Sequence, residues 1–227
     1  MITSSPDAQS RPPRGVPVRA EIDTGLLFIF DMDDVLYSYD WRERMRGMAE
    51  LTGLSFDELR RRWWHDTGER AAEAGVFSTG REYLAAFEVA VGCEVDVSEW
   101  VRLRGGAMTP WPDSIAAVRR ASELGQITLL TNNNALAGEH LAALAPELTD
   151  LFGDHLLTTS HYGARKPDPT VFARVLQKYD VSAEQAFFAD DMLENVEGAA
   201  SIGITAHHFS SGERMLRAIE EFALARA

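Results

Sequence analysis

Three acids, Asp31, Asp33 and Asp34, follow directly on the apolar segment at residues 26–30. Five consecutive apolar residues are typical of a strand that is buried on both faces, so these carboxylates emerge where the strand leaves the core. Open α/β sheets place their sites at that edge. Crowded carboxylates repel one another, and a cation or a proton usually offsets the repulsion. The segment therefore predicts a site for magnesium and a phosphoryl group.

Polar residues suited to the same chemistry occur at three later places in the chain: Thr131 with Asn132, Lys166, and Asp190 with Asp191. In a parallel sheet the carboxyl ends of all strands lie on one edge, so groups that are distant in the sequence converge there. Taken singly, each has an ordinary alternative, since acids also cap helices and a lone lysine usually lies in solvent. The spacing alone does not establish that these residues meet.

From residue 110 onward, helical and strand patterns alternate. Gly125 is suited to ending the first helix, and Asp168 with Pro169 to beginning another. The alternation predicts a doubly wound α/β core, in which helices cover both faces of a parallel sheet. The expected strands are residues 126–130, 155–158, 186–189 and 205–208, and the expected helices are residues 113–124, 137–144, 169–179, 194–202 and a last one from Gly212 behind Ser210 and Glu213.

Between residues 41 and 105 the apolar residues recur at helical spacing, and no clear strand interrupts them. A capping box at Ser55 predicts a helix that runs through residues 63–64. Residues 75–80 form a break, and a further helix is expected to continue to Val91. This part of the chain is predicted to be an all-helical insert.

These patterns divide the 227 residues into three parts. Residues 1–20 are predicted to be a flexible leader, because they are rich in Ser, Pro and Gly and lack the apolar centre of a secretory signal. Residues 21–36 and 110–227 form the predicted α/β core. Residues 37–109 form the predicted helical domain, inserted after the first strand.

The 35 acids and 22 basic residues give a net charge of -13, which argues against nucleic acid or an anionic membrane as a partner. No apolar run approaches the ~20 residues that a membrane helix needs. Cys93 is the only cysteine, so no intramolecular disulfide forms and a reducing compartment is expected. We therefore predict a cytoplasmic protein. The sequence leaves its oligomeric state open.

Four motifs together resemble those of a haloacid dehalogenase superfamily phosphatase, of the kind with a helical cap inserted after the first motif. They are DMDDVL at Asp31–Leu36, LLTN at Leu129–Asn132, RKPDP at Arg165–Pro169 and FFADDMLENVEGA at Phe187–Ala199. They occur in the family's order within residues 26–209, so the match is specific. The resemblance implies a Rossmann-like core.

The resemblance implies a role for each acid of the first motif. Asp31 is expected to attack phosphorus and form an aspartyl-phosphate. Asp33 is expected to protonate the leaving alkoxide and later to take a proton from water. Family members that displace halide lack this second acid, because a halide needs no proton, so Asp33 favours phosphate esters. Asp34 is a departure, since many relatives have a small or amide residue there.

The resemblance also implies the ligands of a magnesium ion. These are the carboxylates of Asp31 and Asp191 and the main-chain carbonyl of Asp33, with Asp190 contributing directly or through water. Magnesium prefers such oxygen ligands and retains some of its waters.

The phosphoryl group is expected to be bound by Thr131, Asn132 and Lys166. Thr131 and neighbouring backbone N–H groups would donate to its oxygens, and Lys166 would neutralise their charge. Asn195, one helical turn past the late acid pair, is expected to orient that loop.

The implied function is hydrolysis of a small phosphate monoester, with sugar phosphates and nucleotides as the classes that the family suggests. Two alternatives stay open. In a phosphomutase, the aspartyl-phosphate passes to another substrate hydroxyl instead of water. In a silent phosphate-binding or regulatory module there is no turnover, although such a module would not need both Asp31 and Asp33.

Overall fold

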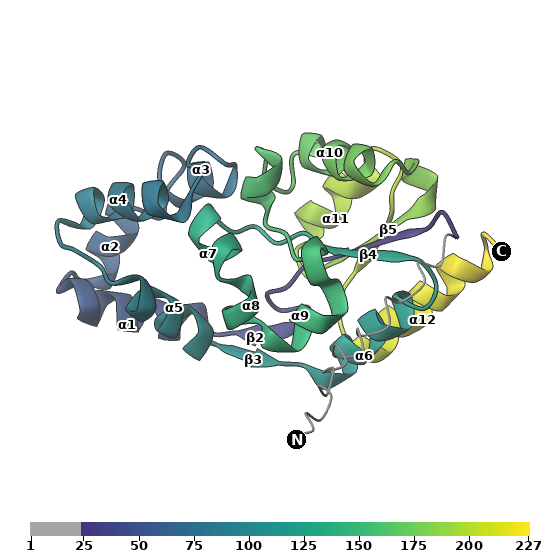
Figure 1. Ribbon diagram of the computed structural model, residues 1–227, viewed down its shortest axis with the longest axis horizontal. Helices are drawn as coiled ribbons and strands as arrows, with labels where there is room; N and C mark the ends of the chain where they lie inside the picture. The colour runs from purple at the N-terminus through teal and green to yellow at the C-terminus, as the bar shows by residue number, and fades with distance from the viewer. Residues whose placement is uncertain (1–23) are drawn as a thin grey trace, which may run out of the picture.

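The computed structural model describes residues 24–227, so the predicted leader lies outside the described residues. Figure 1 shows a layered α/β part and, at one end of it, a group of helices that follows the first strand in the chain. Along the described residues, no helix combines the length and the apolar character that crossing a membrane requires.

A four-stranded parallel sheet forms the centre of the α/β part. Its strands are β1 (Leu27–Phe30), β4 (Gln126–Leu129), β5 (Ala186–Asp190) and β6 (Thr205–His208), in the order β4-β1-β5-β6. Phe30 pairs with Leu129 on one side and with Ala189 on the other. The residues that follow these three positions therefore leave the sheet at the same edge, and β1 is entirely buried.

Helices cover both faces of the sheet (Figure 1). Phe28 and Phe30 belong to the apolar cluster of one face, together with side chains from α6 (Pro112–Ala121) and α12 (Gly212–Leu224). The intervening Leu27 and Ile29 belong to the cluster of the other face, with side chains from α10 (Pro169–Tyr179) and α11 (Leu193–Ala200). The alternation along β1 explains the run of five apolar residues. The predicted doubly wound fold is confirmed.

The chain between β1 and α6 forms the helical insert, which we define as the segment from β2 (Tyr37–Tyr39) to β3 (Met108–Pro110). These two short strands pair in antiparallel fashion. Between them lie α1 (Trp41–Thr52), α2 (Phe56–Arg62), α3 (Glu69–Glu73), α4 (Gly80–Val91) and α5 (Val97–Gly106). The domain boundaries at residues 37 and 109 stay a prediction.

The helical insert has its own apolar cluster, which includes Trp63, Tyr83, Phe87 and Trp100. Helices from the α/β part complete this cluster with Leu136, Ala137 and Leu144.

The remaining helices of the α/β part are α7 (Ala135–Glu139), α8 (Leu141–Leu144) and α9 (Pro146–Phe152), with short 3-10 turns at Gly153–His155, Thr159–Tyr162 and Ala183–Gln185.

The strand predicted at residues 155–158 is wrong. His155 ends a 3-10 turn, and only Thr158 pairs with the sheet, through an isolated bridge to Thr131. The hydroxyl of Thr128 donates to the carbonyl of His155 at 3.1 Å, so this segment contacts β4 through a side-chain hydrogen bond and not through a backbone ladder. Leu156, between them, is only half buried.

Other helix ends differ from the sequence expectation by a few residues. The helix predicted at residues 137–144 is two helices, because the chain breaks at His140. The helix that Ser55 caps ends at Arg62, where Trp63 leaves the helical conformation. Ser211, rather than Ser210, caps α12. The expected cap at Asp168 is present, since its carboxylate accepts from the N–H of Thr170 at 2.8 Å.

We predict that Phe28→Ala lowers the free energy of unfolding by about 3–5 kcal/mol, the usual loss for a buried phenylalanine. Phe28 is fully buried on β1, and its ring centroid lies 6.0 Å from that of Phe187 and 5.5 Å from that of Phe222. Urea unfolding measures the effect. Val89→Ala, at a position 84% exposed on α4, is the control and should change stability by less than ~0.5 kcal/mol. Equal effects would contradict the assigned core.

Candidate active site

Three carboxylates meet at the carboxyl edge of the sheet. Asp31 follows β1, Asp190 ends β5 and Asp191 comes directly after it. One oxygen of each carboxylate can be chosen so that all three lie within 4.8 Å of one another. The N–H of Asp31 donates to the carbonyl of Ala189 at 3.0 Å, which continues the pairing of β1 with β5 into the site.

Lys166 lies between two of these acids. Its Nζ donates to Oδ1 of Asp31 at 2.7 Å and to Oδ2 of Asp190 at 2.6 Å, and its side chain is buried. The side chain of Asn132 holds the lysine's backbone, since Nδ2 donates to the Lys166 carbonyl at 3.1 Å and Oδ1 accepts from the Lys166 N–H at 3.0 Å. The loops after β4 and before α10 are therefore joined at the site.

Burial acts on the pKa values of Asp31 and Lys166 in opposite directions. It raises the pKa of Asp31 well above its ordinary value; the Lys166 ammonium opposes the rise, and repulsion from Asp190 and Asp33 adds to it. Burial by itself would lower the pKa of Lys166, but attraction to Asp190 and Asp31 outweighs it and raises this pKa. The lysine therefore stays charged between the acids.

Negative charge remains in excess after this pairing. Burial raises the pKa of Asp191 to about 6, and repulsion from Asp190 and then Asp34 contributes to the rise. Three carboxylates face one ammonium, and all the available ligand atoms of the acids are hard oxygens. Such a donor set fits a small divalent cation such as magnesium, whose charge would offset the repulsion.

Asp190 is fixed by donors from the start of α11. Its Oδ1 accepts from the N–H of Met192 at 2.8 Å, and both of its oxygens lie within 3.1 Å of Nδ2 of Asn195. Asn195 was expected to orient this loop, and the structure places its side chain on the buried acid itself. Asp191, the next residue, is half buried.

Thr131 lies at the same edge, beyond the end of β4. The N–H of Leu130 donates to the carbonyl of Phe30 at 2.8 Å, which keeps the two chains adjacent past the sheet. The Thr131 side chain is buried, and its Oγ1 accepts from Nδ2 of Asn133 at 2.9 Å. Apart from Asn195, which lies in α11, the residues predicted from the four motifs therefore lie at the carboxyl ends of β1, β4 and β5 or in the loop before α10.

The side chain of Asp33 contacts a residue that the sequence analysis missed. Both carboxylate oxygens lie 2.7 Å from Nη2 of Arg104, which α5 contributes from the helical insert. Arg104 is fully buried, and its guanidinium lies 4.0 Å from the ring centroid of Tyr39. A single arginine on an amphipathic helix usually lies in solvent, so the sequence contained no signal for this contact.

Asp34 occupies a left-handed backbone position, with φ of 56°. Aspartate and asparagine tolerate this conformation better than most side chains do. Its N–H donates to the carbonyl of Tyr37 at 2.7 Å, and its Oδ1 accepts from the N–H of Tyr39 at 3.1 Å. The acid that departs from the family pattern therefore stabilises the turn that leads into the insert.

A family model described as haloacid dehalogenase-like hydrolase matches residues 26–203. The chain belongs to this family. The predicted hydrolase class is therefore confirmed.

Two curated relatives of this hydrolase are phosphatases. Phosphatase MT3486 of Mycobacterium tuberculosis (strain CDC 1551 / Oshkosh) is 31% identical over 185 residues, which cover 79% of this chain and 84% of the relative. Sesquiterpene phosphatase astK of Aspergillus oryzae (strain ATCC 42149 / RIB 40) is 39% identical over 181 residues, which cover 79% of this chain and 77% of the relative.

A solved structure has the same fold as this hydrolase. The HAD family enzyme bt-2542 from Bacteroides thetaiotaomicron, crystallised with magnesium and inorganic phosphate, superposes with a TM-score of 0.68 at 18% identity. The match covers 82% of this chain and 95% of the other.

The helical insert is hydrogen-bonded to two of the loops that carry site residues, the loop after β4 and the loop before α10. On α3, Glu73 Oε2 accepts from Nε of Arg165 at 2.7 Å, next to Lys166. Also on α3, the buried Glu69 accepts from Nδ2 of Asn134 at 2.7 Å, in the loop that begins at Thr131. These two contacts connect the insert with the loops that carry Thr131 and Lys166.

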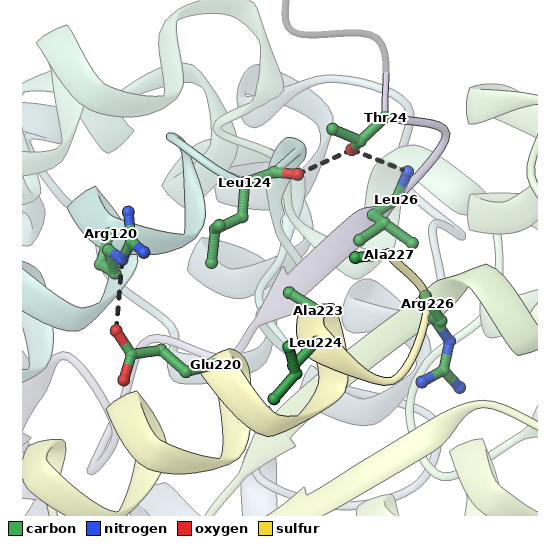
Figure 2. Close-up of a pocket in the computed structure, with 9 residues that line it drawn as sticks. All are labelled: Thr24, Leu26, Arg120, Leu124, Glu220, Ala223, Leu224, Arg226 and Ala227. Atoms are coloured by element: carbon green, nitrogen blue, oxygen red, sulfur yellow. Dashed lines mark hydrogen bonds and ion pairs between the residues drawn. The ribbon is translucent and has the colours of Figure 1, made fainter.

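A cavity of about 430 Å³ lies at the other end of β1, away from the acids (Figure 2). Its lining is mostly apolar. The Thr24 hydroxyl donates a hydrogen bond to the Leu124 carbonyl at 2.7 Å, and Arg120 forms an ion pair with Glu220 at 3.3 Å. None of the predicted site residues lines it. It offers no acid cluster or nucleophile and is not the candidate active site.

We predict that Glu73→Gln becomes more stable relative to the wild type as the pH rises. Burial raises the pKa of Glu73 from 4.5 to about 7, repulsion from Glu69 adds to this, and Arg165 opposes it. The unfolded chain therefore loses its proton first, and folded wild type loses stability between pH 4.5 and about pH 7. Glutamine does not ionise, so the difference should grow by about 1–3 kcal/mol across this window.

Urea unfolding at a series of pH values measures this difference. Glu94→Gln, which removes an exposed acid elsewhere in the insert, is the matched control. A stability difference that shrinks with rising pH would show that Glu73 is ionised more readily in the folded protein than in the unfolded chain.

Proposed function

We propose that this hydrolase is a magnesium-dependent phosphatase, which cleaves a small phosphate monoester through an aspartyl-phosphate on Asp31. The observation that carries the proposal is the position of Asp31, which shares Lys166 with Asp190 and has a second acid, Asp33, two residues further on. The proposed nucleophile, Asp31, thus lies two residues from the proposed proton donor, Asp33, and in contact with the ammonium group of Lys166. The cytoplasm is its proposed location.

Magnesium would be held by the carboxylates of Asp31 and Asp191 and the main-chain carbonyl of Asp33, with Asp190 in direct or water-mediated contact. When bound, it would reduce the repulsion between Asp31 and the negative phosphoryl oxygens. The excess of carboxylates over cations at this edge supports the assignment.

Asp31 and Asp33 perform the chemical steps of the proposed reaction. An oxygen of Asp31 attacks phosphorus in line, and the bond from phosphorus to the leaving oxygen breaks. Asp33 gives a proton to that oxygen and later removes one from the water that attacks the intermediate. The proton that Asp33 donates is thus restored in the second step, and inorganic phosphate is released.

Lys166 and Thr131 are the proposed ligands of the phosphoryl oxygens. Lys166 Nζ contacts Asp31 directly, so a phosphoryl group on that carboxylate lies within its reach. The Asn132 side chain is bonded to the Lys166 backbone, so its contribution to substrate binding would be to hold the lysine in place. Backbone N–H groups next to Thr131 would complete the phosphate contacts.

Asp31→Asn is predicted to reduce turnover to background for every ester, because an amide cannot form the acyl phosphate. Free phosphate release from a panel of sugar phosphates, nucleotides and a prenyl phosphate, with magnesium and with chelator, measures this. The prenyl phosphate is included because one relative is named as a sesquiterpene phosphatase. Asp154→Asn, at an exposed position after α9, makes the same change away from the site and should keep wild-type rates.

Wild-type rates in Asp31→Asn would remove the proposed nucleophile. Isomer formation from hexose phosphates in place of phosphate release would identify a phosphomutase. Magnesium-dependent ligand binding without turnover of any ester would identify a non-catalytic module.

Asp33→Asn is predicted to lower kcat by about 100- to 10 000-fold, the usual contribution of a general acid–base group. The loss should be largest for alkyl phosphates and smallest for p-nitrophenyl phosphate, whose leaving group needs little protonation. Steady-state kinetics of the two ester types measure the difference. Equal losses for both would show that Asp33 does not transfer the proton.

A further inference from the structure

Three buried side chains of the helical insert carry N–H groups without an acceptor. They are Nε and Nη2 of Arg44, Nε and Nη1 of Arg104, and Nε1 of Trp100, and no acceptor among the described residues lies within hydrogen-bond distance of them. The three residues are 5%, 0% and 1% exposed, respectively. All five atoms are donors. We call these three residues the donor cluster.

The donor cluster is assembled around Tyr39, in the strand that leads from the acids into the insert. Nη1 of Arg44 donates to the Tyr39 hydroxyl at 3.1 Å, and the guanidinium of Arg104 lies 4.0 Å from the Tyr39 ring centroid. The guanidinium of Arg44 also lies 4.9 Å from the ring centroid of Trp100. Three different elements, α1, β2 and α5, therefore hold the two cations in place.

Neighbouring acids do not use the free donors. Asp33 accepts only from Nη2 of Arg104, which leaves Nε and Nη1 unpaired. Glu69 acts on Arg44 electrostatically, but its oxygens accept from Trp63, Tyr83 and Asn134 instead. Buried donors without an acceptor are unfavourable, and a planar guanidinium matches a pair of anionic oxygens.

The donor cluster adjoins the proposed reaction on the side of the leaving group. Asp33 contacts Arg104, and in the proposed function Asp33 protonates the oxygen that departs with the alcohol. A phosphoryl group on Asp31 would therefore have its alcohol directed toward Asp33 and Arg104, and Arg44 contacts the same Tyr39 as Arg104 does. A ligand group there belongs to the alcohol, not to the transferred phosphate.

We propose that the substrate's alcohol carries a second anionic group, a carboxylate, which the free donors of Arg44 and Arg104 bind. This inference rests on the proposed phosphatase function and narrows its substrates to phosphorylated carboxylic acids. Trp100 donates a further hydrogen bond to the same group. Arg104 takes part both in positioning Asp33 and in binding the substrate. Its Nη2 contacts Asp33, while its Nε and Nη1 donate to the anionic group of the alcohol.

Matched pairs of esters test the proposal on the wild-type enzyme. 3-Phosphoglycerate is compared with glycerol 3-phosphate, and 2-phosphoglycolate with the monophosphate of ethylene glycol, since each pair differs mainly in one carboxylate. We expect kcat/KM to be at least ~10-fold higher for the acid of each pair. Free glycerate should inhibit competitively, whereas glycerol should not.

Arg44→Met is the variant of choice, because Arg44 does not contact Asp33. It should reduce the preference for the acid of each pair at least ~10-fold, mainly through KM, and Arg44→Lys should restore part of it. Arg46→Met, an exposed arginine one half-turn along α1, is the matched control and should keep the wild-type preference. Circular dichroism checks that each variant is folded.

Each outcome decides between the inference and the function on which it rests. Equal kcat/KM values within both pairs would overturn the inference while leaving a phosphatase. A preference that survives in folded Arg44→Met would overturn the role of the donor cluster. If Arg44→Met does not fold, the wild-type ratios and the inhibition by glycerate decide the question. Absence of turnover for every ester would reject the proposed function itself, and the inference with it.

Discussion

The position of one ammonium group between two buried carboxylates is the constraint on which the rest of the site depends. Lys166 joins Asp31, after the central strand, to Asp190, after its neighbour. Two acids on adjacent strands of a buried sheet would otherwise repel each other, and removing one partner from such a buried arrangement is strongly destabilising. The loop of Lys166 must therefore reach the sheet edge, and the Asn132 side chain fixes it there through the lysine's backbone. The remaining negative charge is what makes the site suitable for a divalent cation.

The helical insert is part of the same electrostatic arrangement. It supplies the arginine that contacts Asp33, and its α3 supplies the acids that contact Asn134 and Arg165. The three contacts join the insert to each of the loops that carry the early acids, Thr131 and Lys166. An insert that covers the proposed active site would exclude water and strengthen the interactions inside it. In the proposed function, selection of the alcohol and orientation of the proton donor would therefore depend on the same helices.

Much of the α/β part could be predicted from the sequence, because its signals are local. The apolar run before Asp31 reflects a strand buried on both faces, and the Asp168 cap marks the start of α10 correctly. The segment expected as a strand at residues 155–158 instead contacts Thr128 through a side-chain hydrogen bond and Thr131 through a single bridge, and no local sequence pattern reveals either contact. The Arg104 contact was missed for a similar reason. It joins residues 71 positions apart, and its position depends on how α5 packs, not on the neighbours of Arg104 in the sequence.

The antiparallel ribbon of β2 and β3 brings the entry and the exit of the helical insert side by side, with Tyr39 opposite Met108. The α/β part therefore only has to span one strand spacing, whatever lies beyond the ribbon. An insert of another length or helix number can be joined at the same two points, provided that it replaces the contacts of Arg104, Glu69 and Glu73 with the α/β part. Recombination at two adjacent points can thus exchange the whole insert above the same sheet edge, and protein engineers can graft chimeric inserts at these two points.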